Sequence, residues 1–416
     1  MRAGPKRWLC RGCALLSDRG PAERRSWCTG SPNPVRIARI VAAALWLAGV
    51  FQPARADSFL DGFRDPQDGK IDISDWLIRR KGFLPVPIVV TEPAVGLGGG
   101  VALMFVRNAG RESGGAAQGG PGTPPDIFVV GGVATENGTK AAFGGGMVSF
   151  GEDRWRYRGG IGRTDIRLQF YGIGGSLGGG EHSIGYALDG WTSNQQLLRR
   201  LGDSETWLGA RWVYLDLDSR ANLAGDPNAG LQPADSAQRA SGLGLMLEHD
   251  SRDNIFTPSR GWSGALEATF YDPAWGSGSR FQTYRGRVFS YWPATPDLVV
   301  AGRIDGRSAN GDTPFYMLPF IDLRGVRAAR YQEEHTAVVE TELRYNVTPR
   351  WGAIGFVGAG RAWGRKSDFG DTSTVVGKGV GVRYLIARQL GMWMGLDFAL
   401  GPEGSVVYLQ VGSAWR

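Results

Sequence analysis

The chain has 416 residues and a formal net charge of +7, with a pI near 9.4. The charge is uneven, because ten of the 47 Lys and Arg residues but only two of the 40 acids lie in residues 1–56. Residues 57–416 carry 37 bases against 38 acids, so the basic pI does not indicate nucleic acid as a partner. All three cysteines, Cys10, Cys13 and Cys28, also lie in residues 1–56, which excludes disulfides and thiolate metal sites from the rest.

Residues 1–56 are typical of a leader that ends in a secretion signal. An apolar run, 40–51, follows two arginines and precedes the small-x-small pattern Ala54-Arg55-Ala56. Cleavage after Ala56 makes Asp57 the expected first mature residue. The basic region before the apolar run is unusually long, so Val35 is a second candidate for the start of translation. Neither the apolar run nor any later one approaches the ~20 residues of a transmembrane helix.

Residues 57–81 form a short charged segment, which we expect to be periplasmic. Residues 68–75 resemble the second half of a calcium-binding loop, but Arg64 and Pro66 occupy ligand positions at which a hard cation needs oxygen atoms. We therefore expect no metal or cofactor here. The sequence predicts instead a turn and a short amphipathic helix over 73–80, at one end of the structure that the following residues form.

Residues 82–416 consist of short segments that alternate with period two. In 336–347, for example, Val339, Thr341 and Leu343 fall on one face while Glu340 and Glu342 fall on the other. A soluble sandwich also produces such alternation. The number of segments, their length and the nearly continuous apolar face favour a transmembrane barrel. The expected fold class is all-β, an antiparallel transmembrane β-barrel with a long loop folded into the lumen.

Sixteen strands are expected, an even number that suits an outer-membrane barrel. Their ranges are 82–92, 95–107, 126–137, 139–150, 154–173, 184–200, 204–218, 241–251, 260–271, 279–292, 297–308, 336–347, 350–363, 376–388, 390–400 and 405–416. Connections after even strands are short and two after odd strands, 219–240 and 309–335, are long. The exception is the Gly/Pro-rich connection 108–125.

Four separated elements resemble those of the BamA/TamA-like superfamily of outer-membrane barrels, of the bacterial surface antigen type. The first is a hairpin over Pro85–Leu103. The second is EHDSRDNIFTPSRG over 248–261, and the third is Leu323-Arg324-Gly325 in a long loop, with Val326 where an aromatic is usual. The fourth is the closing strand. The second element contains a turn motif, and the fourth contains a C-terminal barrel signal. The residues of the turn motif are Asp250, Arg252, Asp253, Pro258 and Gly261, and those of the signal are Val411 and Trp415.

The resemblance implies a lumenal lock, in which Arg324 beside Gly325 reaches acids on the inner wall. The matching strand-twelve acid is Glu342, with Glu340 on the same face. We expect a planar, bidentate pair, which Lys would replace poorly. The family's second acid is replaced by Gly358, which puts the usual two-acid arrangement in doubt. The alternative is that Arg324 is a solvated loop residue.

Many other charges are expected to face the lumen with nearly balanced signs, which predicts a wet, ion-paired interior and not a selective filter. They are Arg285, Arg287, Arg303, Asp305, Arg307, Arg344, Arg383, Asp397, Glu248, Asp250 and Glu267. The seam between the first and last strands should be weak, because Pro85, Pro87 and Pro93 lack amide donors.

These features predict a non-enzymatic barrel that assists outer-membrane assembly or the transport of protein or lipid. Family members that insert or secrete proteins carry POTRA domains before the barrel, and this chain resembles a short, POTRA-less member. Expected partners are outer-membrane lipids, the barrel assembly machinery during insertion and periplasmic proteins, with no nucleic acid. A passive channel is one alternative. An outer-membrane hydrolase built on His249 is another, disfavoured because His249 and Asp250 point to opposite faces of a strand.

Overall fold

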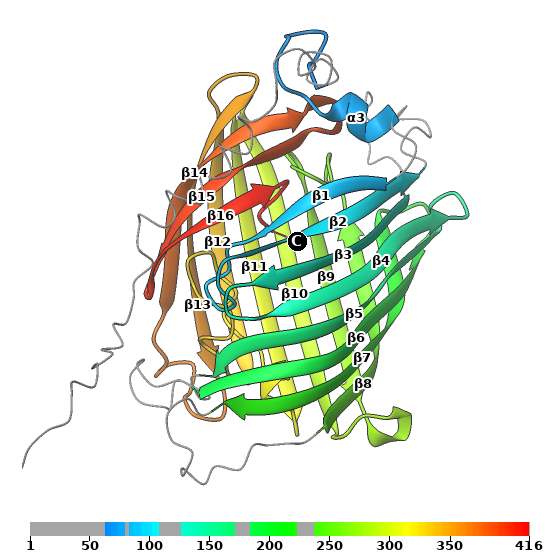
Figure 1. Cartoon of the computed structure of the whole chain (residues 1–416), viewed down its shortest axis with the longest axis vertical. Coiled ribbons are helices and arrows are strands. Elements are labelled where there is room, and N and C mark those ends of the chain that lie inside the picture. Colours follow the sequence, from blue (N-terminus) through cyan, green and yellow to red (C-terminus); the bar gives the residue numbers. More distant parts are fainter. Residues whose placement is uncertain (1–62, 80–82, 108–125, 171–183, 223–236, 416) are drawn as a thin grey trace, which may run out of the picture. The chain divides into compact units, whose positions relative to one another are not determined.

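The computed structural model describes residues 63–79, 83–107, 126–170, 184–222 and 237–415. Its described strands form one antiparallel sheet of sixteen strands in chain order, as expected (Figure 1). The strands are β1 (Phe83–Val90), β2 (Gly98–Arg107), β3 (Asp126–Thr135), β4 (Lys140–Phe150), β5 (Trp155–Phe170), β6 (Ile184–Arg200), β7 (Thr206–Asn222), β8 (Ala237–Asp250), β9 (Gly261–Tyr271), β10 (Phe281–Thr295), β11 (Leu298–Gly311), β12 (His335–Asn346), β13 (Trp351–Trp363), β14 (Val375–Ala387), β15 (Met392–Gly401) and β16 (Gly404–Val411).

Helical structure is scarce in the described residues. One α-helix, α3 (Ser74–Arg79), precedes the sheet where the sequence predicts a helix over 73–80. Three single-turn 3-10 helices lie in connections: η2 (Pro273–Trp275), η3 (Phe315–Met317) and η4 (Arg388–Leu390). None of the described helices is long and apolar enough to cross a membrane.

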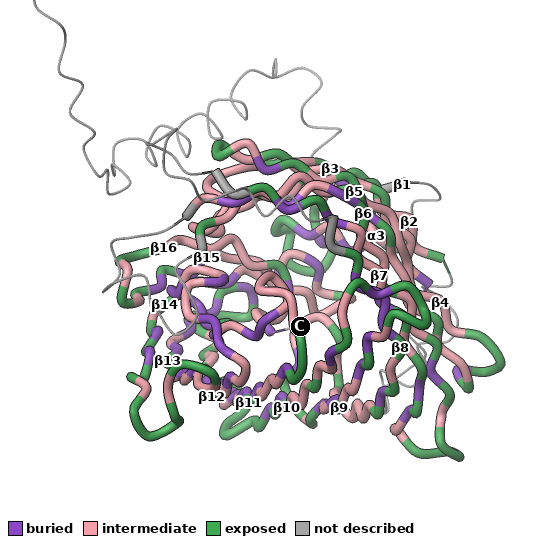
Figure 2. The backbone as a smooth tube through the Cα atoms, turned by 90° about the horizontal axis from the view of Figure 1, so that it is seen from below, coloured by how far each residue is buried: buried purple, intermediate pink, exposed green. Residues whose placement is uncertain are grey.

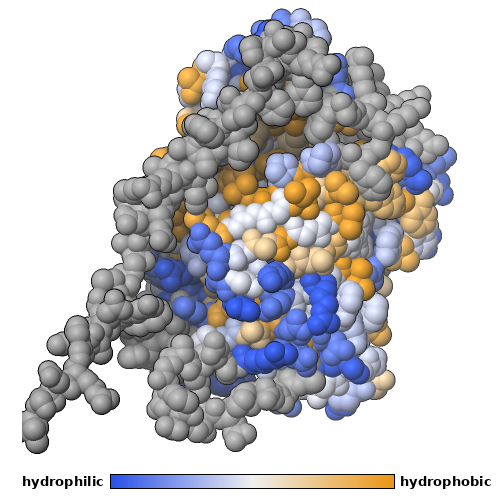
Figure 3. Space-filling view, in the orientation of Figure 1, coloured by the Kyte–Doolittle hydropathy of each residue, from blue (hydrophilic) through white to orange (hydrophobic). Residues whose placement is uncertain are grey.

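The period-two pattern separates two faces in each strand. In β12, Val339 and Leu343 are about half exposed, whereas Glu340 and Glu342 are buried. In β15, Leu396 and Phe398 are exposed while Asp397 between them is fully buried. The sheet curls into a ring (Figure 2), so the buried polar face lines the lumen and the exposed apolar face is the outside. Figure 3 shows apolar side chains gathered across the upper part of the visible face.

The longest fully described connection follows an odd strand, as the sequence predicts, although 136–139 and 402–403 are short connections that also follow odd strands. β10 joins β11 through two residues, 296–297, and β12 joins β13 through 347–350, whereas β11 joins β12 through 312–334. The end of the barrel with the connections after even strands is called here the short-turn end, and the opposite end the long-loop end. The connection 108–125 and the leader 1–56 lie outside the described residues.

The sheet ends at β1 on one side and β16 on the other. Within the described residues β1 pairs with β2 alone and β16 with β15 alone. Pro85 and Pro87 lie in the edge strand β1, the position in a sheet at which proline is tolerated. The weak seam that we expected therefore has no β-ladder between its two strands.

Candidate functional site: the lumenal loop and the seam

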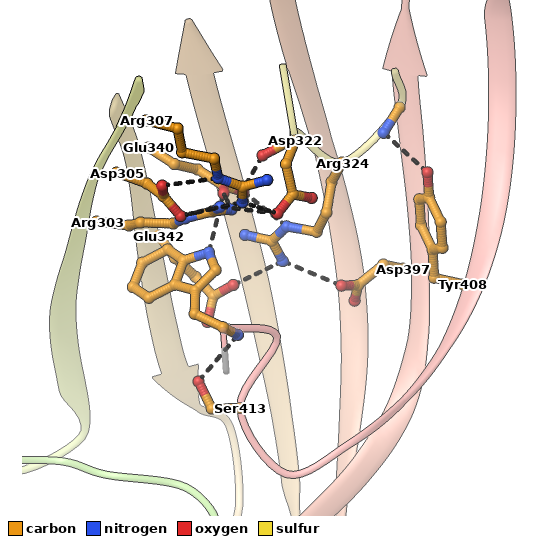
Figure 4. A network of polar contacts seen from close by, with 12 residues as sticks. Arg303, Asp305, Arg307, Asp322, Arg324, Glu340, Glu342, Asp397, Tyr408 and Ser413 are labelled. Atoms are coloured by element: carbon orange, nitrogen blue, oxygen red, sulfur yellow. Dashed lines mark hydrogen bonds and ion pairs between the residues drawn. The ribbon is translucent and has the colours of Figure 1, made fainter. Parts of the chain in front are cut away.

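The loop between β11 and β12, residues 312–334, folds into the lumen and carries Arg324 to the inner wall (Figure 4). Arg324 Nε donates a hydrogen bond to Glu340 Oε1 at 2.7 Å, and Nη1 donates to Asp397 Oδ2 at 3.0 Å. Nη1 also lies 2.7 Å from Glu342 Oε2 as an ion pair. All four side chains are at most 8% exposed. Arg324 is thus a lumenal residue and not a solvated one.

The geometry corrects two details of the expected lumenal lock. Arg324 does not form a bidentate pair with one carboxylate, because its guanidinium is shared among acids on β12 and β15. The acid missing at Gly358 is supplied by Asp397, which we predicted to face the lumen without assigning it to the lock. Asp397 also binds Arg383, whose Nη2 donates to Oδ2 at 3.0 Å.

Gly358 has a packing role in place of an acidic one. A Cβ built at Gly358 would lie 2.6 Å from Leu323 Cδ2, so this glycine leaves room for the loop to lie against β13. Gly325 has φ +88°, and a Cβ there would lie 3.0 Å from the backbone of Leu400. Since only glycine adopts this conformation at low cost and fits this space, Arg324 is presented by a bend pressed onto β15.

The lock is a strongly coupled charge cluster. Burial alone would lower the pKa of Arg324, but the negative charges of Glu342, Glu340 and Asp397 outweigh it and raise that pKa well above its usual value. The guanidinium carbon also lies 3.6 Å from the centre of the Phe356 ring, an additional cation–π contact. Arg324 therefore stays charged at any physiological pH.

A second ion cluster, beside the first, holds Asp322 of the loop, two residues before Arg324. Asp322 Oδ2 accepts hydrogen bonds from Arg307 Nη2 at 2.8 Å and from Arg303 Nη2 at 3.1 Å. Both arginines also bind Asp305 on the same strand (Figure 4). The sequence predicts the inward arginines and Asp305, but it gives no signal for Asp322, because loop residues have no strand register.

The start of the loop contacts the inner wall at another place. In η3, Phe315 packs edge-on against Tyr186 of β6, with ring centres 5.1 Å apart, and Met317 packs against a cluster that contains Val213 of β7 and Phe281 of β10. The loop thus spans the lumen between β6–β10 and β12–β15. These apolar contacts were not expected from the sequence.

The C-terminal tail also enters the lumen, which corrects our placement of Trp415. We expected Trp415 to lie in the last strand, 405–416, but β16 ends at Val411 and Gly412 has φ +77°. Trp415 is 4% exposed and packs among Phe289, Tyr291, Val299 and Ala301 of β10 and β11. Its Nε1 donates to Glu340 Oε2 at 2.9 Å, so the tail and the lumenal lock share an acid.

The turn motif lies between β8 and β9 at the short-turn end. Arg252 binds Asp250 in a bidentate manner, with both nitrogen–oxygen distances 2.7 Å. Asp253 Oδ1 accepts from the backbone of Ser259 at 2.9 Å, which closes the turn. Pro258 is fully buried, and Gly261 has φ +93° with no room for a Cβ beside Ser251.

This turn reaches the opposite side of the barrel. Asn254 Nδ2 donates to the carbonyl of Leu390 at 2.9 Å. The carbonyl of Phe256 accepts from the backbone nitrogen of Ser413 at 2.5 Å, and Gly412 donates to Trp393 at 2.7 Å. The motif therefore holds the start of the inward tail, a role that its spacing alone does not indicate.

The described N-terminal residues, 63–79, are attached to the short-turn end and are called here the N-terminal segment. Arg350, 1% exposed, precedes β13 and is surrounded by Asp65, Asp68 and Asp72. Its Nε donates to Asp68 Oδ2 at 2.6 Å and its Nη1 to Asp72 Oδ2 at 2.6 Å. The carboxylates of the calcium-like sequence thus bind a guanidinium.

This attachment also includes the end of β14 and the connection from β14 to β15. Ile73 donates its backbone N–H to Ile386 at 2.8 Å, and Gln389 donates to Ser74 Oγ at 3.1 Å. The hydrogen bond to Asp68 raises the pKa of Arg350 above its usual value, against the effect of burial. The same contact lowers the pKa of Asp68.

The histidines do not form a hydrolase-like arrangement in the described residues. His249 stacks on Trp262, with ring centres 4.2 Å apart, and its Nδ1 lies 3.0 Å from Thr206 Oγ1. His335 is paired with Ser308 Oγ at 2.9 Å on the outer face, beside Trp363, and His182 lies outside the described residues. Among the described side chains, no group of three or more His, Cys, Asp or Glu is placed to hold a metal.

Comparisons with known proteins agree with this architecture. The structure is similar to that of BamA from Haemophilus ducreyi lacking POTRA domains 1–3, with TM-score 0.51 and 12% identity over 86% of this chain and 81% of that one. It is also similar to CdiB from Escherichia coli, with TM-score 0.57 and 14% identity over 80% of this chain and 62% of that one. At such identities the likeness shows the fold alone. No curated protein sequence matches the chain.

The sequence itself matches a family model. Residues 150–391 match the model of the Omp85 superfamily domain, and they include the turn motif, the loop and the wall residues of the lumenal lock on β12. More than half of the chain is covered. This protein therefore belongs to the Omp85 superfamily, whose barrels lie in outer membranes.

Proposed function

We propose that this protein assists assembly of the outer membrane, by helping to insert protein or to transport protein or lipid, and that its seam is the working part. The observation that carries the proposal is that β1 and β16 are both free edges in the described sheet. A free edge presents unpaired N–H and C=O groups and can pair with an added strand. In a barrel wall, such an edge gives an incoming strand a template at membrane depth, where unpaired backbone groups are costly.

The lumen supports this proposal over a passive channel. The loop crosses the interior between η3 and Arg324, and Trp415 fills the space against Phe289 and Tyr291. The loop and the tail therefore occupy part of the path that a solute would take through the barrel. A hydrolase is also disfavoured, because His249 lies against Trp262 and Thr206 and has no carboxylate partner among the contacts described.

The proposed partners follow from this role. Outer-membrane lipids contact the apolar outer face, the barrel assembly machinery inserts the protein, and periplasmic proteins deliver its clients. The N-terminal segment lies at the short-turn end, which we propose faces the periplasm. No nucleic acid and no cofactor have a place in the proposal.

The experiment closes the seam reversibly. Cysteines at Val89 and Ser405, which lie near the long-loop end of β1 and β16, are oxidised in barrels reconstituted in liposomes, in a chain whose three native cysteines are replaced by serine. The control pair replaces Ile304 and Val339, which are direct partners on β11 and β12. We expect the control pair to cross-link more efficiently than the seam pair, because only the control pair lies in a ladder.

The readout is the rate at which an unfolded barrel precursor, or in parallel a labelled phospholipid, enters the liposome membrane. The wild-type barrel should accelerate one of these processes, oxidation of the seam pair should abolish the acceleration, and a reductant should restore it. Oxidation of the control pair should have no effect. Equal acceleration with the seam oxidised and reduced, or none for the wild type, would contradict the proposal.

A further inference from the structure

The seam has side-chain contacts where it has no β-ladder, and they come from the end of the lumenal loop. Residues 325–331, called here the loop tip, follow Arg324 and lie at the long-loop end of the barrel. The loop tip contacts both β16 and the connection that follows β1. It is therefore the described segment that joins the two sides of the seam at this end.

On the β16 side, the loop tip makes a set of polar contacts. The backbone N–H of Gly325 donates to Tyr408 Oη at 3.1 Å (Figure 4). The hydroxyl of Tyr331 donates to Glu403 Oε1 at 2.6 Å, and Arg330 Nε lies 3.6 Å from the same oxygen. Since Glu403 lies between β15 and β16, the loop tip is tied to the last hairpin along its length.

On the β1 side, the contact depends on Glu92. Its Oε1 accepts hydrogen bonds from the backbone of Ala328 at 3.1 Å and of Ala94 at 3.3 Å. Its own carbonyl accepts from Gly96 at 3.0 Å, which shapes the turn between β1 and β2. Burial raises the pKa of Glu92, against the two amide hydrogen bonds. One carboxylate thus organises the first hairpin and joins it to the loop tip.

We propose that the loop tip holds the two sides of the seam together, and that the seam opens when the contact between Glu92 and the loop tip breaks. This inference rests on the proposed function, in which the seam is the working part. Among the hydrogen bonds described for these residues, the loop tip reaches the β1 side through Glu92, whereas it is held on the β16 side at Tyr408, at Glu403 and, through Arg324, at the lumenal lock. When the seam opens at the long-loop end, the first hairpin leaves and the loop tip stays with β16.

Residues on both sides of this contact border a cavity. Arg327 and Ala328 of the loop tip, together with Pro93 and Ala94, line a lumenal cavity of about 820 Å³. A hydrogen bond that can be replaced by water contributes little net stability compared with a packed ladder. A weak contact of this kind suits a seam that opens and closes while the rest of the barrel stays folded.

The test measures distances across the seam by double electron–electron resonance. Spin labels at Val89 and Ser405, both exposed and near the long-loop end, report opening. Labels at Arg327 and Ser405 report whether the loop tip stays with β16. The protein is the full-length barrel in liposomes with its native cysteines replaced by serine, and a heat-modifiable gel band confirms that each variant is folded.

Glu92→Ala should raise the ratio of long to short Val89–Ser405 distances about fivefold, the effect of one typical hydrogen bond. The Arg327–Ser405 distances should stay unchanged. Glu92→Gln should resemble the wild type, because an amide oxygen can still accept from Ala328. The matched control is Glu334→Ala, which removes an ion pair with the exposed Arg365 from the same loop without touching the seam.

The proposal is overturned if folded Glu92→Ala has the wild-type distances, or if Glu334→Ala widens them equally, since the change would then be a general loosening of the loop. If Glu92→Ala does not fold, Glu92→Ser takes its place, because a Ser hydroxyl can still accept from the backbone two residues on, at Ala94, but is too short to reach Ala328. Its Val89–Ser405 distances should lengthen while its Arg327–Ser405 distances stay unchanged, and wild-type Val89–Ser405 distances in that folded variant also overturn the proposal. These distances do not depend on any client, so failure of the proposed function would appear only in the insertion and transport rates.

Discussion

Replacement of Arg324 by Ala tests the lumenal lock directly. The change removes the cation shared by Glu340, Glu342 and Asp397, each at most 6% exposed as a side chain. Removal of one partner of a buried ion pair costs about 3–5 kcal/mol when the remaining charge is uncompensated. Loss of the cation–π contact between Arg324 and the Phe356 ring adds up to about 2 kcal/mol where the site is desolvated.

The surrounding network reduces that cost. Asp397 keeps Arg383 as a partner, Glu342 keeps Arg344 with Nε 3.2 Å from Oε1, and Glu340 keeps the indole of Trp415. No carboxylate is left without a neighbouring donor. We therefore expect a loss of about 3 kcal/mol, at the lower end of the range for a broken buried pair.

The assay is heat-modifiable gel mobility, in which the folded band disappears at a characteristic temperature. Arg324→Ala should lower that temperature by about 5 °C or more, and Arg324→Lys should recover only part of the loss, because one ammonium cannot reach acids on two strands. The matched control is Arg365→Ala, which removes an exposed pair worth at most about 1 kcal/mol.

A double-mutant comparison gives the decisive result. Arg324→Ala combined with Glu340→Ala should be less damaging than the two losses summed, because both remove the same 2.7 Å contact. Strict additivity, or a loss no greater than that of Arg365→Ala, would refute a lock in which these residues are coupled.

Three further predictions concern separate parts of the chain. Amino-terminal sequencing of the purified barrel should begin at or near Asp57; a product that retained Cys28 would contradict the secretion signal. Gly358→Asp should lower the heat resistance despite restoring the family's acid, because its Cβ meets Leu323 at 2.6 Å; unchanged resistance would contradict that packing. Arg350→Ala should expose the N-terminal segment to protease at neutral pH. In the wild type, the pKa of Asp68 is lowered, so Asp68 stays ionised and the attachment stays intact above the ordinary carboxyl pKa of about 4. Protection of the wild-type segment should be lost only as the pH falls below that ordinary value.

The strands could be predicted from the sequence because alternation is a local property. A residue such as Asp397 is assigned to the lumen by its neighbours in β15 alone, and the structure confirms its burial. Arg324, Glu340 and Glu342 were found through the family motif. The partnership between Arg324 and Asp397 was not predicted, because it depends on the course of a loop across the lumen and on the curvature of the wall.

Contacts between turns that lie far apart in the chain could also not be predicted from the sequence. Arg350 looks like an ordinary turn residue, and its three aspartates lie more than 270 positions earlier. The inward turn of Trp415 was missed because Val411 and Trp415 preserve the strand alternation. The one available signal was Gly412, whose φ of +77° is a conformation that favours glycine.

Two of the contacts that were not predicted involve segments next to the edge strands of the sheet. A sheet that does not close by hydrogen bonds between β1 and β16 lacks the energy of that ladder, so other groups must hold the two edges near each other. The loop tip supplies this at the long-loop end through Glu92 and Tyr408. At the short-turn end, the N-terminal segment is fixed to Arg350 before the chain continues into β1. Side-chain contacts of this kind break one at a time, whereas a ladder breaks cooperatively, so the proposed opening of the seam can begin at either end while the remaining strands stay paired.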